Sequence, residues 1–343
     1  MAEDRGSGKN SNGRQAAMRI LVTGGAGYVG SHTCKLLASQ GHVPVVVDSL
    51  VYGHEWAVQW GPFYKLDIFE KEKIVEVLKK EKIEAVLHFA AFAYVGESVK
   101  NPYKYYHNNV LGTMSLLEAM KEAGVLKIVF SSTCATYGEP EIVPIPENCT
   151  QSPINPYGHS KLMVETILQD YARAYGLSAV CLRYFNACGA DVDLQIGEAH
   201  NPETHLIPLA LQAAYEEDKS LTIFGTDYET EDGTCIRDYI HVMDLAAAHV
   251  LALSRIQKNG IFEAYNVGTG NGLSVFQIVS AIEKIAKRQV KRTLGLRRAG
   301  DPPRLIANSE RAFKELGWKP VFSDVENIIA TAHGWHVKHF LKK

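Results

Sequence analysis

Tyr157 and Lys161 are the two residues whose types and spacing point most directly to chemistry. They lie in Pro156-Tyr157-Gly158-His159-Ser160-Lys161, which leads into a stretch with the apolar density of a helix. Residues four apart on a helix project from one face, and Val164 and Leu168 continue that face, so the pair is expected to point inward. An ammonium near a phenol favours the phenolate and lowers the pKa of the phenol. Tyr157 is therefore a candidate general base.

A glycine-rich turn near the start of the chain is the candidate site for a hydride acceptor. The apolar run at residues 18–23 ends at Gly24-Gly25-Ala26-Gly27-Tyr28-Val29-Gly30, and a helical pattern follows. In a dinucleotide site, Gly24 would allow the tight turn, Gly27 the approach of a pyrophosphate, and Gly30 the close packing of helix on strand. The phosphates would then lie at a helix N-terminus, which favours an anion.

Asp48 indicates which dinucleotide this turn would bind. It ends the next expected strand, at residues 43–47, and follows Gly24 by 24 residues. A carboxylate at this place can accept both hydroxyls of an adenosine ribose and repels a 2′-phosphate. No arginine occurs in residues 49–53. The sequence therefore predicts NAD rather than NADP.

Strands and helices alternate through the first half of the chain, which predicts how these residues are positioned. Such alternation indicates an α/β fold with a Rossmann-type parallel sheet, helices on both faces and ligands over the carboxyl ends of the strands. The strand expected at residues 127–131 runs into Ser131-Ser132-Thr133, a hydroxyl cluster one loop before Tyr157. The other strands expected after Asp48 are at residues 63–66 and 85–91, and helices are expected at residues 70–80 and 102–123.

Composition excludes several classes of function. The 36 Lys and Arg residues nearly balance the 38 Asp and Glu residues, which gives no support to a nucleic-acid or membrane-surface role. No apolar run has the length of a membrane helix. The six cysteines form no zinc pattern, so we expect reduced thiols, a cytoplasmic protein and no metal site. Residues 1–17 are polar and are expected to be a disordered extension or tag.

Together these segments resemble the extended short-chain dehydrogenase/reductase superfamily. Within it, the chain is similar to the UDP-glucose (UDP-galactose) 4-epimerase family over most of residues 18–335. The matching segments are Thr23-Gly24-Gly25-Ala26-Gly27-Tyr28-Val29-Gly30-Ser31-His32, His88-Phe89-Ala90-Ala91, Val95-Gly96-Glu97-Ser98, Tyr157 to Lys161, Leu182-Arg183-Tyr184-Phe185-Asn186, residues 232–245 and Tyr265-Asn266-Val267-Gly268.

The resemblance implies an enzyme that interconverts UDP-galactose and UDP-glucose through a 4-keto sugar, with transient reduction of a tightly held NAD. In that scheme Tyr157 is the base, Thr133 hydrogen-bonds the sugar 4-oxygen and Lys161 binds the nicotinamide ribose. The expected cofactor contacts are Gly24, Gly27, Tyr28, Val29, Gly30, Asp48, Ser49, Leu50, Asp67, Ile68, Phe89, Ala90, Ala91, Asn109, Tyr157, Lys161 and Phe185. The expected substrate contacts are Thr133, Asn186, His205, Leu206, Thr222, Ile223, Phe224, Arg237, Arg298, Asp301 and Leu305, with the two arginines on the diphosphate.

The pattern of the chain changes after Phe185, which predicts a second, smaller and mixed lobe. Residues 18–186 are expected to form the NAD-binding domain, to which residues 237–256 return. The substrate-binding lobe would consist mainly of residues 187–236 and 257–343. Apolar strips through Met163 and Ile167, and through Leu116 and Met120, predict a homodimer joined by a four-helix bundle, which the resemblance also implies.

Three positions depart from the family's pattern and leave the substrate open. Ala93 stands where Lys is frequent, His205 where Asn is common, and Leu305 where a bulky Tyr excludes N-acetylated sugars and a small Cys or Ser admits them. The intermediate size of Leu305 favours UDP-glucose and UDP-galactose. The alternatives are a UDP-xylose/UDP-arabinose or UDP-N-acetylhexosamine 4-epimerase, an open dehydrogenase that exchanges its cofactor, and a non-catalytic NAD-binding sensor. Cys134 and Ala135 replace the acidic residues that a 4,6-dehydratase needs.

Overall fold

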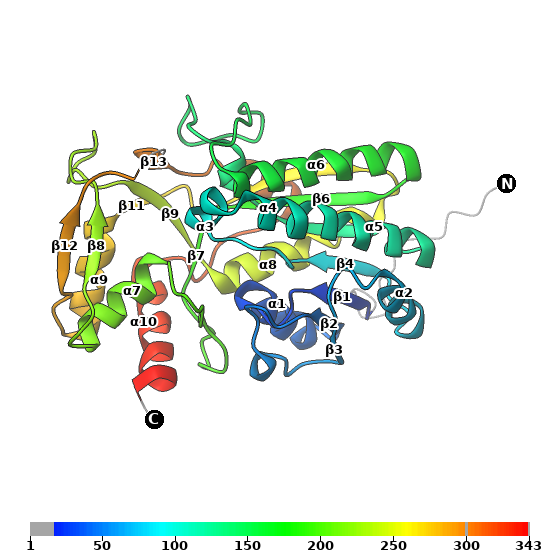
Figure 1. Cartoon of the computed structure of the whole chain (residues 1–343), viewed down its shortest axis with the longest axis horizontal. Helices are drawn as coiled ribbons and strands as arrows, with labels where there is room; N and C mark the ends of the chain where they lie inside the picture. Colours follow the sequence, from blue (N-terminus) through cyan, green and yellow to red (C-terminus); the bar gives the residue numbers. More distant parts are fainter. Residues whose placement is uncertain (1–16, 299–300, 342–343) are drawn as a thin grey trace.

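The computed structural model of the protein describes residues 17–298 and 301–341. The expected N-terminal extension lies outside the described residues, apart from Ala17. A seven-stranded sheet, in the order β10-β6-β5-β4-β1-β2-β3, forms the centre of the larger domain (Figure 1). All six strand pairings are parallel, which confirms the predicted Rossmann-type fold. The strands are β1 (Arg19–Thr23), β2 (Val43–Asp48), β3 (Phe63–Lys65), β4 (Ala85–His88), β5 (Lys127–Thr133), β6 (Ser178–Tyr184) and β10 (Phe262–Val267).

Helices cover both faces of this sheet because its strands are apolar on both sides. In β1, Ile20 and Val22 face one core and Leu21 faces the other. Helices α1 (Tyr28–Ser39) and α8 (Val242–Ala252) contribute to the first core. The second core is formed with α2 (Lys71–Lys80), α5 (Gly112–Ala123) and α6 (Pro156–Tyr175). Buried parallel sheets of α/β proteins have this two-sided arrangement.

Helix α6 starts where the sequence predicts. Pro156 occupies its first turn, and the side chain of the preceding Asn155 accepts a hydrogen bond from the Gly158 N–H at 2.9 Å. The helix ends at Gly176, whose φ of +71° is a left-handed conformation that glycine adopts without strain. Val164 and Leu168 are fully buried, which confirms that the face shared by Tyr157 and Lys161 points inward.

The helix expected at residues 102–123 is less regular than predicted. It consists of α4 (Pro102–Tyr105), a π-helical segment η2 (Tyr106–Leu111) and α5. Leu116 and Met120 are fully buried in the core of their own chain. The prediction that these two residues form an exposed strip that contacts a second subunit is therefore wrong, because their side chains already pack in the second core, against the sheet.

The smaller lobe lies at one end of the sheet (Figure 1). Strands β8 (Leu221–Phe224) and β12 (Arg292–Gly295) pair in parallel, and α7 (Leu206–Tyr215), α9 (Val275–Ala286) and α10 (Val325–His336) pack around one core. A third sheet contains β7 (Asn186–Cys188), β9 (Ile236–His241), β11 (Gly272–Ser274) and β13 (Arg304–Leu305). The remaining short elements are η1 (Glu55–Ala57), α3 (Val95–Lys100), η3 (Cys134–Thr136), η4 (Arg255–Gln257), η5 (Ala312–Leu316) and η6 (Val337–Leu341).

The division into lobes differs from the expected one in two places. Strand β10, expected in the substrate lobe, is an edge strand of the main sheet, and Trp318 also packs in the first core of that domain. Of residues 237–256, α8 packs on the main domain, whereas β9 belongs to the third sheet. Among the described helices, none has both the length and the hydropathy of a membrane span.

Candidate active site

Tyr157, Lys161 and Thr133 meet at the carboxyl end of β5. Tyr157 and Lys161 lie in the first turns of α6, and all three side chains are buried. The Lys161 Nζ donates a hydrogen bond to the Ser131 carbonyl at 2.7 Å and lies 6.0 Å from the centre of the Tyr157 ring. It also lies 4.7 Å from the centre of the Phe130 ring. Helix α6 and strand β5 thus bring the predicted catalytic residues into one volume.

Burial controls the protonation of these groups. Burial raises the pKa of Tyr157, the nearby Tyr184 adds to the rise, and a hydrogen bond with Thr133 opposes it. Burial also lowers the pKa of Lys161 to about 7, against the attraction of the Glu165 carboxylate. In the chain without cofactor, the net shift of the Tyr157 pKa is upward. That Lys161 lowers this pKa together with the positive nicotinamide ring stays a prediction.

Thr133 links the end of β5 to the turn that follows it. Its Oγ1 accepts a hydrogen bond from the Ala135 N–H at 3.1 Å, which starts η3. A hydrogen bond with its hydroxyl also lowers the pKa of the Tyr157 phenol, against the larger effect of burial. The hydroxyl is thus fixed between the backbone and the candidate base, where it can hydrogen-bond a ligand oxygen.

The glycine turn between β1 and α1 has the predicted geometry. Gly24 has a φ of +73°, and a Cβ built on it would lie 2.6 Å from the Ala90 nitrogen. A Cβ on Gly30 would lie 2.2 Å from the Gly24 carbonyl oxygen, so only glycine lets α1 pack this closely. At Gly27, which precedes α1, a Cβ would meet only that carbonyl, at 3.3 Å. Gly27 therefore leaves its outer side clear for a phosphate, as a dinucleotide site requires.

Asp48 lies beside this turn at the end of β2. Its Oδ2 accepts a hydrogen bond from the Ala26 N–H at 3.0 Å, and its Oδ1 accepts one from the Leu50 N–H at 2.8 Å. Leu50 has a φ of +61°, so the loop turns back sharply toward the carboxylate. Each carboxylate oxygen keeps a lone pair for a ribose hydroxyl. These features fit NAD.

Several expected cofactor residues serve the protein's own structure through their side chains. The Asn109 amide hydrogen-bonds the Phe92 N–H and carbonyl and donates to the Ser160 Oγ, which ties η2 to α6. The Ile68 side chain is buried in the second core. The Tyr28 hydroxyl donates to the Gly189 carbonyl at 2.6 Å. The predicted cofactor contacts of Asn109 and Ile68 stay predictions.

The remaining expected cofactor residues surround the same edge of the sheet. The N–H groups of Phe89 and Ala90 both donate to the Thr23 carbonyl, at 2.9 and 3.1 Å, and so form the wall opposite Gly24. Phe185 is buried beside Cys134. The segments that follow the carboxyl ends of β1, β2, β3 and β4 contain Gly24, Val29, Ser49, Asp67 and Ala91.

Arg237 and Asp301 are joined on the substrate side. The Arg237 guanidinium forms an ion pair with Asp301 and donates to the Ile236 carbonyl at 2.8 Å. Leu305 pairs with Arg237 across β13 and β9 and packs on the cluster that contains Cys134 and Phe185. Leu305, from the second lobe, therefore packs on the cluster that includes Cys134, the residue after Thr133.

Strand β8 contains three consecutive residues that were expected to contact substrate, and only two of their side chains face outward. Thr222 and Phe224 face outward, and the Arg298 guanidinium lies 4.1 Å from the centre of the Phe224 ring. The Ile223 side chain points the opposite way into the lobe core, because successive strand residues alternate between faces. A contact of Ile223 with substrate would therefore involve its backbone.

Comparison with known proteins agrees with this geometry. The NAD dependent epimerase/dehydratase family matches residues 20–268. This chain belongs to that family. A UDP-glucose 4-epimerase from Rhizobium meliloti is 52% identical over 317 residues, which are 92% of this chain and 96% of that protein. The family's dependence on NAD agrees with the geometry of the glycine turn and Asp48.

Solved structures give the same result at the level of the fold. The crystal structure of a Brucella ovis UDP-glucose 4-epimerase in complex with NAD has a TM-score of 0.90 and 54% identity, and the match covers 93% of this chain and 98% of that chain. The UDP-Glc/GlcNAc 4-epimerase of Campylobacter jejuni has a TM-score of 0.82 and 40% identity, covering 94% of this chain and all of that chain, 100%.

Four residues of this epimerase/dehydratase family member form a cluster that we did not predict. Glu198, His200, Glu203 and His205 each place one potential ligand atom within 4.8 Å of the others. The His205 ring forms an ion pair with Glu198, and its predicted contact with substrate stays a prediction. Leu206 begins α7 and packs on the lobe core, and Asn186 is exposed at the start of β7. The spacing Glu-x-His-x-x-Glu-x-His was the signal that could have revealed the cluster.

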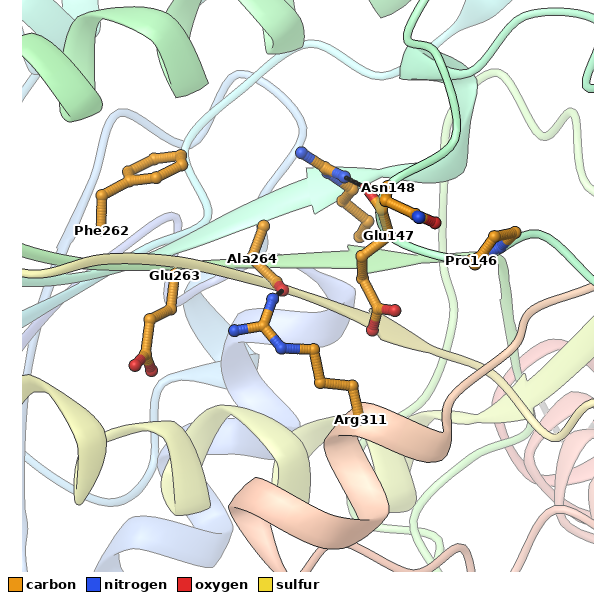
Figure 2. A pocket seen from close by; sticks show the side chains of 8 residues that line it. Pro146, Glu147, Asn148, Phe262, Glu263, Ala264 and Arg311 are labelled. Carbon is orange, nitrogen blue, oxygen red and sulfur yellow. Dashed lines mark hydrogen bonds between the residues drawn. The ribbon is translucent and has the colours of Figure 1, made fainter.

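Two cavities show which parts of the surface are hollow. A narrow one, of about 10 Å³, lies at the glycine turn between Gly27, Tyr28, Tyr52 and His200. A larger one, of about 390 Å³, opens beside β10 and is lined by Pro146, Glu147, Asn148, Arg183, Phe262, Glu263, Ala264 and Arg311 (Figure 2). The second cavity contains none of the catalytic residues expected for this family, so volume alone does not identify the active site.

Proposed function

We propose that this chain is a UDP-glucose 4-epimerase that interconverts UDP-galactose and UDP-glucose with a tightly held NAD. The observation that carries the proposal is the convergence of Tyr157, Lys161 and Thr133 at the same sheet edge as the glycine turn. The Rhizobium meliloti and Brucella ovis relatives, both named UDP-glucose 4-epimerases, support it. A non-catalytic NAD sensor would have no use for these three residues in one buried volume.

The residues divide the work as follows. Bound NAD supplies a hydride acceptor and donor for carbon 4 of the sugar. The N-terminus of α1 at Gly27 holds the phosphates, Asp48 the adenosine ribose, and Lys161 the nicotinamide ribose. Tyr157 takes the proton of the 4-hydroxyl and later returns it, while Thr133 hydrogen-bonds the same oxygen. The 4-keto sugar rotates in the site between the two proton transfers, and this rotation inverts the configuration at carbon 4.

The nucleotide part of the substrate provides the anchor. Arg237 and Arg298 bind the diphosphate through charge-assisted hydrogen bonds. Asp301 pairs with Arg237 and orients its guanidinium. Binding energy placed on the diphosphate holds carbon 4 near Tyr157 without freezing the ring, which must rotate.

The test uses the purified protein without added cofactor. We expect UDP-galactose to be converted to UDP-glucose, and nicotinamide absorbance or fluorescence to accompany the protein. Tyr157→Phe should lose nearly all turnover and keep the bound cofactor. Tyr171→Phe is the matched control, because Tyr171 lies on the same helix and donates to Glu118 at 2.7 Å, away from the site. A near-normal rate in Tyr157→Phe, or a requirement for added cofactor, would contradict the proposal.

We also propose a homodimer joined through the face of α5 and α6, in which Met163 keeps its expected place and Leu111 and Met114 take the place of Leu116 and Met120. The two helices are tied by the Tyr171–Glu118 hydrogen bond and lie side by side (Figure 1). Their exposed apolar residues are Leu111 in η2, Met114 in α5 and Met163 in α6, which are 51%, 39% and 45% exposed. An apolar strip on adjoining helices favours a four-helix interface. Light scattering should give the mass of two chains, and Met114→Glu with Met163→Glu should give the mass of one.

A cytoplasmic location is the last part of the proposal. The six cysteines all lie among the described residues and are free thiols, and five of them are buried. Secreted proteins more often pair their cysteines in disulfides. Fractionation of cells that express the protein should recover it with cytoplasmic markers, and recovery with secreted proteins would contradict the assignment.

A further inference from the structure

We propose that the segment between β7 and α7 binds a divalent transition-metal ion of the zinc type through Glu198, His200, Glu203 and His205. The four side chains bring two imidazole nitrogens and two carboxylate oxygens within 4.8 Å of one another. This site lies outside the catalytic residues, and its argument does not depend on the proposed function.

The spacing of the ligand atoms fits one ion. The His200 Nδ1 lies 3.0 Å from the Glu198 Oε1 and 3.7 Å from the Glu203 Oε1. The His205 Nδ1 contacts the same Glu198 oxygen. A tetrahedral zinc ion with bonds of about 2.0–2.1 Å separates its ligand atoms by about 3.3 Å. The two His200 distances lie on either side of this value, whereas the His205 and Glu198 atoms lie closer together and would have to separate to bind one ion.

The orientation of His200 provides an independent observation. Its Nδ1 is buried within ion-pair distance of two carboxylates, but its geometry toward neither of them is that of an aligned hydrogen bond. A lone pair on Nδ1 would point into the space that the carboxylates share, where an ion would coordinate it.

The surroundings hold these side chains in place. The Glu203 Oε1 accepts hydrogen bonds from the N–H groups of Thr204 and His205, at 2.7 and 2.9 Å. The Trp335 indole donates to the Glu198 carbonyl at 2.8 Å, which attaches the segment to α10. Carboxylate ligands of metal sites are commonly held by such outer hydrogen bonds.

Two aromatic rings of the larger domain pack against the His200 ring. Tyr28, at the start of α1, and Tyr94 both approach the His200 ring edge-on, with centroids 6.0 Å away. The site therefore connects the helix at the glycine turn with the start of α7 in the smaller lobe. An ion here would join the two lobes beside the cofactor site.

The ligand types select the class of ion. Two imidazoles with two carboxylates suit Zn²⁺ and neighbouring transition metals. Mg²⁺ and Ca²⁺ prefer sites built from oxygen atoms. The competing explanation is that the cluster contains only ion pairs between histidines and glutamates, and the experiment distinguishes the two.

The first measurement uses the unsubstituted full chain. After treatment with EDTA, the protein is titrated with ZnCl₂ and separately with CoCl₂. We expect about one zinc ion per chain by elemental analysis, a higher thermal midpoint, and the intense visible bands of four-coordinate Co²⁺. A cobalt spectrum like that of the aqueous ion, with no zinc retained, would overturn the proposal without any substitution.

The second measurement assigns the site to its residues. His200→Ala and Glu198→Gln should each lose the stoichiometric zinc. His107→Ala is the matched control, because this histidine lies in η2 and its ring contacts Phe69 and Tyr103. Zinc retained equally by His200→Ala and by the control would show that the ion binds elsewhere and would overturn the assignment. If the two substituted proteins do not fold, the cobalt spectrum of the unsubstituted chain decides.

Discussion

The carboxylate of Glu165 forms a buried ion pair with Arg183, in which Oε2 and Nη2 are 2.6 Å apart and the side chains are 3% and 6% exposed. Glu165 follows Lys161 by one turn of α6 and also accepts a hydrogen bond from the Ser132 hydroxyl, next to Thr133. Arg183 donates to the Tyr137 hydroxyl at 2.9 Å. The ion pair therefore joins α6, which carries Tyr157, to β6, and the Ser132 hydrogen bond joins the same helix to β5, which carries Thr133.

Removing the charge of Glu165 should destabilise the protein. Glu165→Gln leaves the Arg183 guanidinium buried without its anion, and breaking a buried pair in this way costs about 3–5 kcal/mol. Glu310→Gln is the control, since its pair with Lys314 has side chains that are 64% and 72% exposed. The control should leave the free energy of unfolding nearly unchanged, because solvent screens an exposed pair. Urea unfolding of both variants measures the difference, and equal values would contradict it.

Lys161 should make the stability of the cofactor-free protein depend on pH. Its pKa is about 7 in the folded state and about 10.4 when the chain is unfolded. Between these values the unfolded state binds more protons, so the free energy of unfolding rises with pH across this window. Lys161→Met removes this contribution. Unfolding of both proteins at about pH 6 and about pH 9 should show the wild type gaining stability relative to the variant. A constant difference between them would contradict the lowered pKa.

A methyl group at Gly30 should disrupt the glycine turn. In Gly30→Ala, the new Cβ would lie 2.2 Å from the Gly24 carbonyl oxygen, so α1 must shift away from β1. We expect a loss of stability of about 1–3 kcal/mol or more, and loss of bound NAD. Gly96→Ala is the control, because a Cβ there has nothing within 4 Å. Absorbance of released cofactor and thermal unfolding measure the two effects. NAD retained at the wild-type level in Gly30→Ala would contradict the assigned turn.

The size of residue 305 should set the preference for N-acetylated sugars. Leu305 packs on the cluster beside Thr133, where a substituent on the sugar would meet it. Leu305→Ser should raise the rate on UDP-N-acetylglucosamine relative to UDP-glucose by about tenfold or more, and Leu305→Tyr should lower it. Leu296→Ser is the control, since Leu296 is 91% exposed. Initial rates on both substrates test this, and an unchanged ratio would show that Leu305 does not contact the sugar.

The sequence by itself determined the elements that depend on local patterns. Apolar runs, the glycine turn and the Asn155-Pro156 start of α6 specify β1, β2, α1 and α6, because strand propensity, capping and positive φ act over a few neighbouring residues. Parallel strands place their carboxyl ends together, so the expectation that Thr133 and Tyr157 meet followed from the same patterns.

Only the tertiary structure decided what depends on neighbours far along the chain. Packing buried Leu116 and Met120 inside the chain, turned Ile223 into the lobe core and placed β10 at the edge of the main sheet. Desolvation, which no local pattern reports, raises the pKa of Tyr157 and lowers that of Lys161. The folded segment before α7 likewise brought Glu198 and Glu203 against His200 and His205, because the direction of a side chain is set by everything that packs around it.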